Sequence, residues 1–179
     1  MPLPESFALR RFPLVAAVLV ALTCALSTGR LVAAGKASMP KAGDSFPVLA
    51  KENLEGKLPD LEGKVVLVDF WASWCGPCKA SFPALKEIHE KYSSQGLTIV
   101  AVSIDESKDD MLGFLKKTGV PFVAVRDSKG SLAEKLDIQS IPTSFLIDRT
   151  GKILMVHSGY GGDATKKQYI QEIEAALKK

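Results

Sequence analysis

The feature that most constrains this chain is a pair of cysteines, Cys75 and Cys78, separated only by Gly76-Pro77. An apolar, strand-like run ends just before the pair, and a run typical of a helix follows it. This order places the first thiol at a helix N-terminus, where unpaired N–H groups and the helix dipole stabilise negative charge. Because the thiolate is the species that attacks a disulfide, the pair is expected to exchange disulfides.

The other uses of a cysteine pair fit this chain poorly. A structural disulfide framework needs more bridges at wider spacing, and Cys24 is the only further cysteine. A structural zinc site needs four ligands, and the sequence has no second C-x-x-C and no His pair. We therefore predict no metal and no cofactor other than a redox-active disulfide between Cys75 and Cys78.

The N-terminus has the pattern of an export signal. Arg10 and Arg11 precede an apolar run over residues 12–26, and small residues then lead to Ala34. This predicts a secretory signal peptide over residues 1–34. The apolar run would span roughly 22 Å as a helix, short of the roughly 30 Å of a bilayer core. An uncleaved membrane anchor remains the alternative, and both interpretations place the folded part in the periplasm or elsewhere outside the cytoplasm.

Composition divides the remainder of the chain into a short linker and one domain. Residues 35–44 are small and polar, which is typical of a linker, and residues 45–179 have the length of one domain. Without residues 1–34 the basic and acidic side chains nearly balance. No nucleic acid partner is therefore expected.

Hydrophobic patterning predicts an α/β sandwich, with a central mixed β-sheet flanked by helices. Strands are expected at residues 65–71, 97–104, 120–125, 143–147 and 152–157. Helices are expected at residues 77–93, 109–117, 131–136 and 163–178, the second with Met111, Leu112 and Leu115 facing inward. Residues 46–50 and 58–61 are expected to pair as an N-terminal hairpin.

The segment from Val68 to Lys79 resembles the active-site segment of thioredoxin. Pro83 matches the proline inside that family's active-site helix, and Ile141-Pro142-Thr143 matches its cis-proline loop. The leader, the hairpin region and residues 102–107 resemble the exported TlpA/ResA-like branch of the thioredoxin superfamily. The resemblance implies a thioredoxin-like sandwich with an N-terminal hairpin and an extra helix insertion.

Two positions depart from the patterns of these relatives. Many TlpA/ResA-like proteins carry an acidic residue three places after the second cysteine, where this chain has Ser81. The acid usual in thioredoxin is present as Asp69. Thioredoxin also places a lysine near that acid on the next strand, and this chain aligns Ala101 there.

Three residues are the candidates for catalysis. Cys75 is expected to be the more exposed thiol and to attack the substrate disulfide, and Cys78 then resolves the mixed disulfide. Asp69 lies in an otherwise apolar strand, so burial would raise its pKa and let it accept a proton from Cys78. The alternative for Asp69 is a solvated strand-end residue without a role.

Residues on both sides of the cysteine pair are candidates for binding the substrate. Trp74 is expected to form an apolar rim beside the thiol, next to Gly76 and Pro77. The resemblance implies a cis Pro142 beside the disulfide and an Ile141 whose backbone pairs with an extended substrate segment. Without the resemblance, Pro142 would be interpreted as an ordinary proline at the start of a strand.

An accessible active site suits a monomer. The resemblance implies an exported thiol–disulfide oxidoreductase that reduces protein disulfides, with apocytochrome c among its substrates. It also implies a membrane thiol transporter of the DsbD/CcdA type as the electron donor. Two alternatives stay open. One is a disulfide oxidase or isomerase of the same fold, and the other is a non-catalytic copper-handling or docking module.

Overall fold

The computed structural model describes residues 38–179, so the predicted leader at residues 1–34 lies outside the described residues. The described part contains a five-stranded sheet with the order β3-β2-β1-β4-β5. The strands are β1 (Val65–Trp71), β2 (Leu97–Ser103), β3 (Val123–Arg126), β4 (Thr143–Ile147) and β5 (Ile153–Ser158). The first three run parallel, whereas β4 and β5 are antiparallel to their neighbours, which confirms the predicted mixed sheet.

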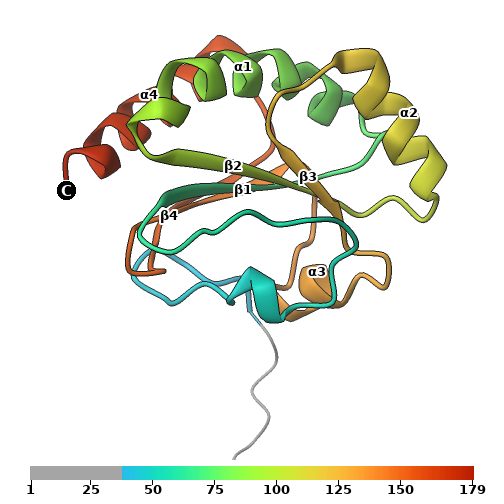
Figure 1. Cartoon of the computed structure of the whole chain (residues 1–179), viewed down its shortest axis with the longest axis horizontal. Helices are drawn as coiled ribbons and strands as arrows, with labels where there is room; N and C mark the ends of the chain where they lie inside the picture. The colour runs from blue at the N-terminus through green and yellow to red at the C-terminus, as the bar shows by residue number, and fades with distance from the viewer. Residues whose placement is uncertain (1–37) are drawn as a thin grey trace, which may run out of the picture. The chain divides into compact units, whose positions relative to one another are not determined.

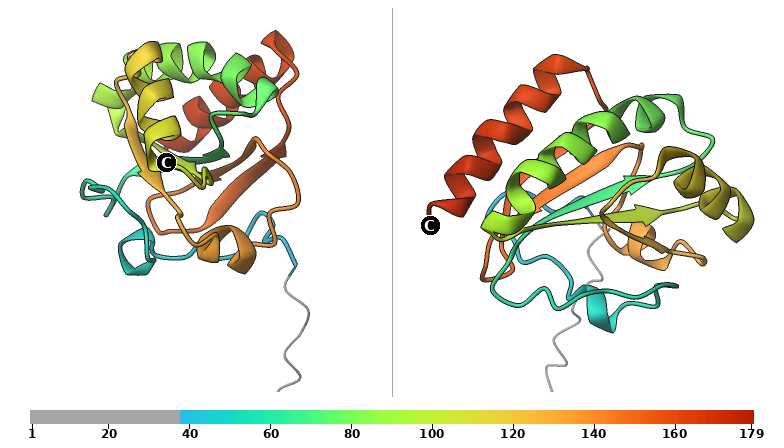
Figure 2. Two further views of the ribbon diagram at one scale, coloured as in Figure 1. Left: turned by 90° about the vertical axis from the view of Figure 1, so that its right-hand side faces the viewer. Right: turned by 45° about the horizontal axis from the view of Figure 1, so that its top comes forward.

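Helices cover both faces of this sheet. One face carries α1 (Gly76–Tyr92), α2 (Lys108–Thr118) and α4 (Asp163–Leu177), and the other carries α3 (Ser131–Lys135) and the N-terminal segment (Figures 1 and 2). Two short 3-10 helices, η1 (Leu49–Lys51) and η2 (Ser93–Gln95), complete the elements. Each face has its own apolar cluster, so the sheet is buried on both sides.

The central strand β1 leads directly to the cysteine pair. All seven of its residues are buried, and successive side chains alternate between the two faces. Val65, Leu67 and Trp71 join the cluster beneath α1 and α4, whereas Val66, Val68 and Phe70 join the opposite cluster. The same alternation places Asp69 on the α1 face.

The predicted N-terminal hairpin is wrong. Residues 46–61 form no strand. Glu55 makes an isolated bridge to Arg126, and Ser45, just before the segment, makes one to Lys152. Prolines at positions 47 and 59 remove backbone donors that a hairpin would use. The segment instead lies on the α3 face of the sheet, where Phe46 and Leu49 join the apolar cluster and Leu61 packs against it.

Two finer predictions also need correction. Leu112 does not face inward: its side chain is 46 % exposed, whereas Met111 is buried. Strand β3 begins at Val123 and not at residue 120. Pro121 precedes it and has no N–H to contribute to a strand ladder, which explains the later start.

The described part of the predicted linker, residues 38–44, contacts the domain. Gly43 N–H donates to the Ile153 carbonyl over 2.8 Å, and Ile153 N–H donates to the Asp44 carbonyl over 2.9 Å. Met39 packs against the cluster on the α3 face. Within residues 38–179, no helix is both long and apolar enough to cross a membrane.

Candidate redox site

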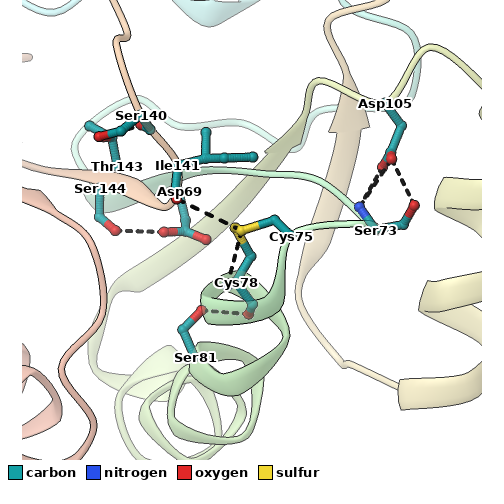
Figure 3. Close-up of a disulfide and its surroundings, with 10 residues drawn as sticks. All are labelled: Asp69, Ser73, Cys75, Cys78, Ser81, Asp105, Ser140, Ile141, Thr143 and Ser144. Atoms are coloured by element: carbon teal, nitrogen blue, oxygen red, sulfur yellow. Dashed lines mark hydrogen bonds between the residues drawn. A yellow bond between two sulfur atoms is a disulfide. The ribbon is translucent and has the colours of Figure 1, made fainter.

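The cysteine pair lies where β1 passes into α1. Cys75 is the N-cap residue of α1, and its Sγ accepts a hydrogen bond from the Cys78 N–H over 3.2 Å. Pro77 lies in the first turn, where its missing N–H has no helical partner to lose. Cys75 and Cys78 form a disulfide, with their Cα atoms 5.3 Å apart (Figure 3). The first sulfur thus occupies the helix N-terminus, as predicted.

The two cysteines differ in their access to solvent. Cys75 is 5 % exposed, and Cys78 is fully buried. Their neighbours Gly76 and Pro77 are exposed, and Trp74 is 66 % exposed. In the disulfide state Cys75 is therefore the only one of the pair in contact with solvent. The exposed apolar side chain of Trp74 belongs to the residue next to it.

The loop before β4 lies against the disulfide. The Ile141–Pro142 peptide bond is cis, and Pro142 is buried. The carbonyl oxygen of Ile141 is 3.8 Å from the Sγ of Cys75, although the two residues are 66 positions apart. A disulfide sulfur carries no proton, so this is a contact in the oxidised state. The fold thus brings the predicted Ile141-Pro142 pair to the cysteines.

Asp69 is buried on the α1 face, with 1 % of its surface exposed. Figure 3 shows its carboxyl group pointing toward the disulfide. Burial raises the pKa of Asp69 to about 7, and the hydrogen bond from Ser144 opposes that shift. Asp69 is therefore not the solvated strand-end residue of the alternative interpretation.

The surroundings of Asp69 differ from those of the acid in thioredoxin, as the two departing positions indicated. Ala101 is the residue paired with Asp69 across β1 and β2, so no lysine stands there. The Ser81 hydroxyl donates to the Cys78 carbonyl over 2.8 Å and is buried. Ser81, at the position where many TlpA/ResA-like proteins carry an acid, therefore uses its hydroxyl to bond a carbonyl of its own helix.

Sequence analysis missed a set of hydrogen bonds that holds the loop before Cys75. The buried Asp105 accepts from the Ser73 N–H at both carboxylate oxygens, each over 3.0 Å, and from the Ser73 hydroxyl over 2.7 Å. The Ser103 hydroxyl adds a bond of 2.7 Å. Polar residues at the buried end of an apolar strand were the only sequence signal for this cluster.

Ser144 was missed in the same way. It lies within the apolar strand β4, is 1 % exposed, and donates its hydroxyl proton to Asp69 Oδ1 over 2.5 Å. The hydroxyl of Tyr169, in α4, lies 2.8 Å from that of Ser144. Among residues 38–179, no group of three or more His, Cys, Asp or Glu side chains is placed to hold a metal ion.

Comparisons with known proteins agree with this geometry. The Redoxin family model matches residues 40–173. The thiol-disulfide oxidoreductase ResA of Bacillus subtilis is 36 % identical over 170 residues, which cover 92 % of this chain and 94 % of that protein. All of these matches include the cysteine pair and most of the sheet.

Solved structures show the same fold. A putative thiol:disulfide interchange protein DsbE from Chlorobium tepidum is 39 % identical with a TM-score of 0.68, covering 78 % of this chain and 99 % of that one. StoA from Bacillus subtilis is 29 % identical with a TM-score of 0.55, covering 62 % and 83 % of the two chains. The predicted thioredoxin-like sandwich is confirmed, and the chain belongs to the Redoxin family within the thioredoxin superfamily.

Proposed function

We propose that this protein is an extracytoplasmic thiol–disulfide oxidoreductase that reduces protein disulfides. The observation that carries the proposal is a disulfide whose more accessible sulfur, that of Cys75, caps α1 beside a cis-proline loop. The relatives ResA and DsbE bear names that describe thiol–disulfide chemistry, and they support the same conclusion. The export pattern of residues 1–34 supports the location.

The reaction begins with the reduced dithiol form. The helix N-terminus stabilises the thiolate of Cys75, and the Cys78 N–H is placed to donate to it. This thiolate attacks one sulfur of the substrate disulfide and forms a mixed disulfide. The other substrate sulfur leaves as a thiolate and takes a proton from water.

Resolution of the mixed disulfide uses the buried half of the site. Asp69, with its pKa raised to about 7, accepts the proton of Cys78. The Cys78 thiolate then attacks the Sγ of Cys75, which restores the Cys75–Cys78 disulfide and expels the second substrate sulfur. That sulfur takes up a proton, so the substrate has gained two electrons and two protons at the expense of the protein dithiol.

Substrate binding is assigned to the surface around Cys75. The exposed Trp74 provides an apolar contact, and Gly76 and Pro77 form the adjoining exposed turn. The backbone of Ile141 lies beside the sulfur, where an extended substrate segment pairs with it as an added strand. Pro142 follows Ile141 in this loop and is buried.

Reduction outside the cytoplasm needs a source of electrons, because the periplasm is kept oxidising. We assign this supply to a membrane thiol transporter of the DsbD/CcdA type, and we include apocytochrome c among the substrates. Both assignments follow from the family resemblance of the cysteine segment. The protein is proposed to act as a monomer, because the site is complete within one chain.

The proposal is tested with insulin as substrate and dithiothreitol as reductant. The wild-type protein should accelerate insulin reduction, Cys75→Ser should abolish the acceleration, and Cys78→Ser should accumulate a covalent mixed disulfide. Activity that survives Cys75→Ser would contradict the assignment of the nucleophile. The redox potential tests the direction: a value near about −270 mV fits a reductant, and one near about −120 mV identifies an oxidase.

A further inference from the structure

Three buried polar side chains from distant parts of the sequence meet behind the disulfide. Asp69 of β1 and Ser144 of β4 are partners across the antiparallel pair, 75 positions apart. Tyr169 of α4 covers the same face of the sheet, and its hydroxyl lies 2.8 Å from the Ser144 hydroxyl. All three are at most 2 % exposed, so their hydrogen bonds are shielded from water.

The direction of each hydrogen bond follows from the number of protons available. An ionised carboxylate only accepts, so Ser144 must donate its single proton to Asp69 Oδ1. The Ser144 oxygen can then only accept at its second contact, so Tyr169 is the donor there. Burial raises the pKa of Tyr169, and the charge of Asp69 raises it further, so the phenol keeps the proton it donates.

The two carboxylate oxygens of Asp69 are therefore unequal. Oδ1 accepts a hydrogen bond from the Ser144 hydroxyl, whereas Oδ2 is buried and has no hydrogen-bond partner among residues 38–179. A proton added at Oδ2 leaves the bond from Ser144 to Oδ1 intact. Oδ2 is thus the oxygen that is free to take a proton.

Few charged groups lie near the Asp69 carboxylate on this face of the sheet. On α1, Cys75 and Cys78 are joined in a disulfide and carry no titrating proton, and on β2 the partner of Asp69, Ala101, is uncharged. His157 of β5 and Glu172 of α4 pair with each other over 2.7 Å, beyond the Tyr169 ring. Neutral hydroxyls therefore provide the hydrogen bonding that the carboxylate receives on this face.

We propose that Ser144 and Tyr169 are positioning residues that orient Asp69 through the chain Tyr169 to Ser144 to Asp69, and so reserve Oδ2 for the proton of Cys78. This inference rests on the proposed function, because it gives Asp69 the task of accepting that proton. It adds two residues that do not touch the reacting sulfurs. Loss of these two hydrogen bonds should raise the pH at which Asp69 ionises. The pH profile of turnover should then move to higher pH as well.

The test is a titration of the Asp69 carboxyl carbon by NMR in the oxidised protein, which requires no turnover. Ser144→Ala should raise the midpoint by about one to two pH units, the effect of losing one hydrogen bond to a charged group. Tyr169→Phe should raise it by a smaller amount, and Ser144→Thr, which keeps the hydroxyl, should restore it. The rising limb of the pH profile of insulin reduction should shift in parallel.

Tyr92→Phe is the matched control, because Tyr92 is equally buried and its hydroxyl bonds a different carboxylate, that of Glu174, over 2.5 Å. It should leave both midpoints unchanged. An Asp69 midpoint that stays fixed in both Ser144→Ala and Tyr169→Phe would overturn the inference. If Ser144→Ala fails to fold, an unchanged midpoint in Tyr169→Phe is enough to overturn it.

Failure of the wild type to reduce insulin would instead overturn the proposed function. The titration does not depend on turnover, so it would still test the hydrogen bonds from Tyr169 through Ser144 to Asp69.

Discussion

Asp105 holds Ser73 by three hydrogen bonds, although the two residues are 32 positions apart in the sequence. Ser73 lies two residues before Cys75, in the loop between β1 and α1. The carboxylate follows the end of β2, the neighbour of β1 in the sheet. The geometry of the loop that carries the nucleophile is therefore fixed from the adjacent strand.

Asp105→Ala should lower the free energy of unfolding by about 3 kcal/mol, because it leaves the half-buried Ser73 N–H and the buried Ser103 hydroxyl without their acceptor. It should also slow insulin reduction, since the loop before Cys75 loses its anchor. Guanidinium unfolding and the insulin assay measure the two effects. Asp109→Ala, at an exposed carboxylate in the first turn of α2, should lower the free energy of unfolding by less than about 1 kcal/mol and leave insulin reduction unchanged. Equal losses in both variants would contradict this role for Asp105.

Gly56 permits the close approach of the N-terminal segment to β3. Its φ is +131°, and a Cβ at this position would lie 2.9 Å from the Val125 Cγ1 atom and 3.3 Å from the Ala124 carbonyl oxygen. Gly56→Ala should therefore lower the free energy of unfolding by about 2–3 kcal/mol, from backbone strain and the clash together.

Gly43→Ala separates these two causes. Gly43 also has a positive φ, +93°, but a Cβ there would have no atom within 4 Å. This variant should lose about 1 kcal/mol from strain alone. Chemical denaturation of both variants gives the comparison, and a Gly43→Ala loss as large as that of Gly56→Ala would show that contact with Val125 is not the cause.

Asp69 should make the stability of the oxidised protein depend on pH. Its folded-state pKa of about 7 lies above its ordinary value of 3.8, so between these values the folded protein holds a proton that the unfolded chain has released. The free energy of unfolding contributed by this group therefore falls as pH rises from about 4 to about 7. Above pH 7 the full cost of the buried charge is present.

Asp69→Asn removes that cost. It should raise the free energy of unfolding at pH 8 by as much as about 4 kcal/mol, at about 1.4 kcal/mol per pKa unit, and should give no such gain at pH 4. Guanidinium titrations of the oxidised protein at the two pH values measure the difference. The same gain at both values would mean that the ionisation of Asp69 is not responsible.

Local patterns carried most of the fold. Each strand of the sheet could be predicted from an apolar run, and α1 and α4 from amphipathic periodicity. Burial on one or both faces determines where apolar residues occur along a strand or helix. The N-terminal segment was misread because its apolar residues pack against α3 and the sheet without pairing with each other. Patterning records that a residue is buried, and it does not record which partner buries it.

The same limit applies to the site. The position of Cys75 at a helix start could be derived from its neighbours in the sequence, and Pro142 from the family resemblance. The contacts of Asp69 with Ser144 and of Ser73 with Asp105 depend on strand order and register, which are long-range properties. A polar residue in a buried strand shows that a partner is needed, but only the sheet identifies that partner.

The two tryptophans beside the cysteine pair should respond differently to removal. Trp71 is fully buried, with its ring 4.7 Å from that of Phe82, so Trp71→Ala should cost about 3–5 kcal/mol of stability. Trp74 is 66 % exposed, so Trp74→Ala should leave the melting temperature almost unchanged. Its loss should instead weaken the binding of protein substrates.

For Trp74→Ala we expect a KM for insulin that is at least about five-fold higher, with little change in kcat, because truncation of an aromatic anchor removes contact area from bound substrate. A small disulfide reagent, which is too small to contact Trp74 while it reacts with Cys75, should react at the wild-type rate. Val48→Ala is the control, since Val48 is 58 % exposed but lies between Phe46 and Leu49, which belong to the cluster on the α3 face of the sheet. An unchanged KM in Trp74→Ala, or an equal rise in Val48→Ala, would show that the exposed indole does not dock the substrate.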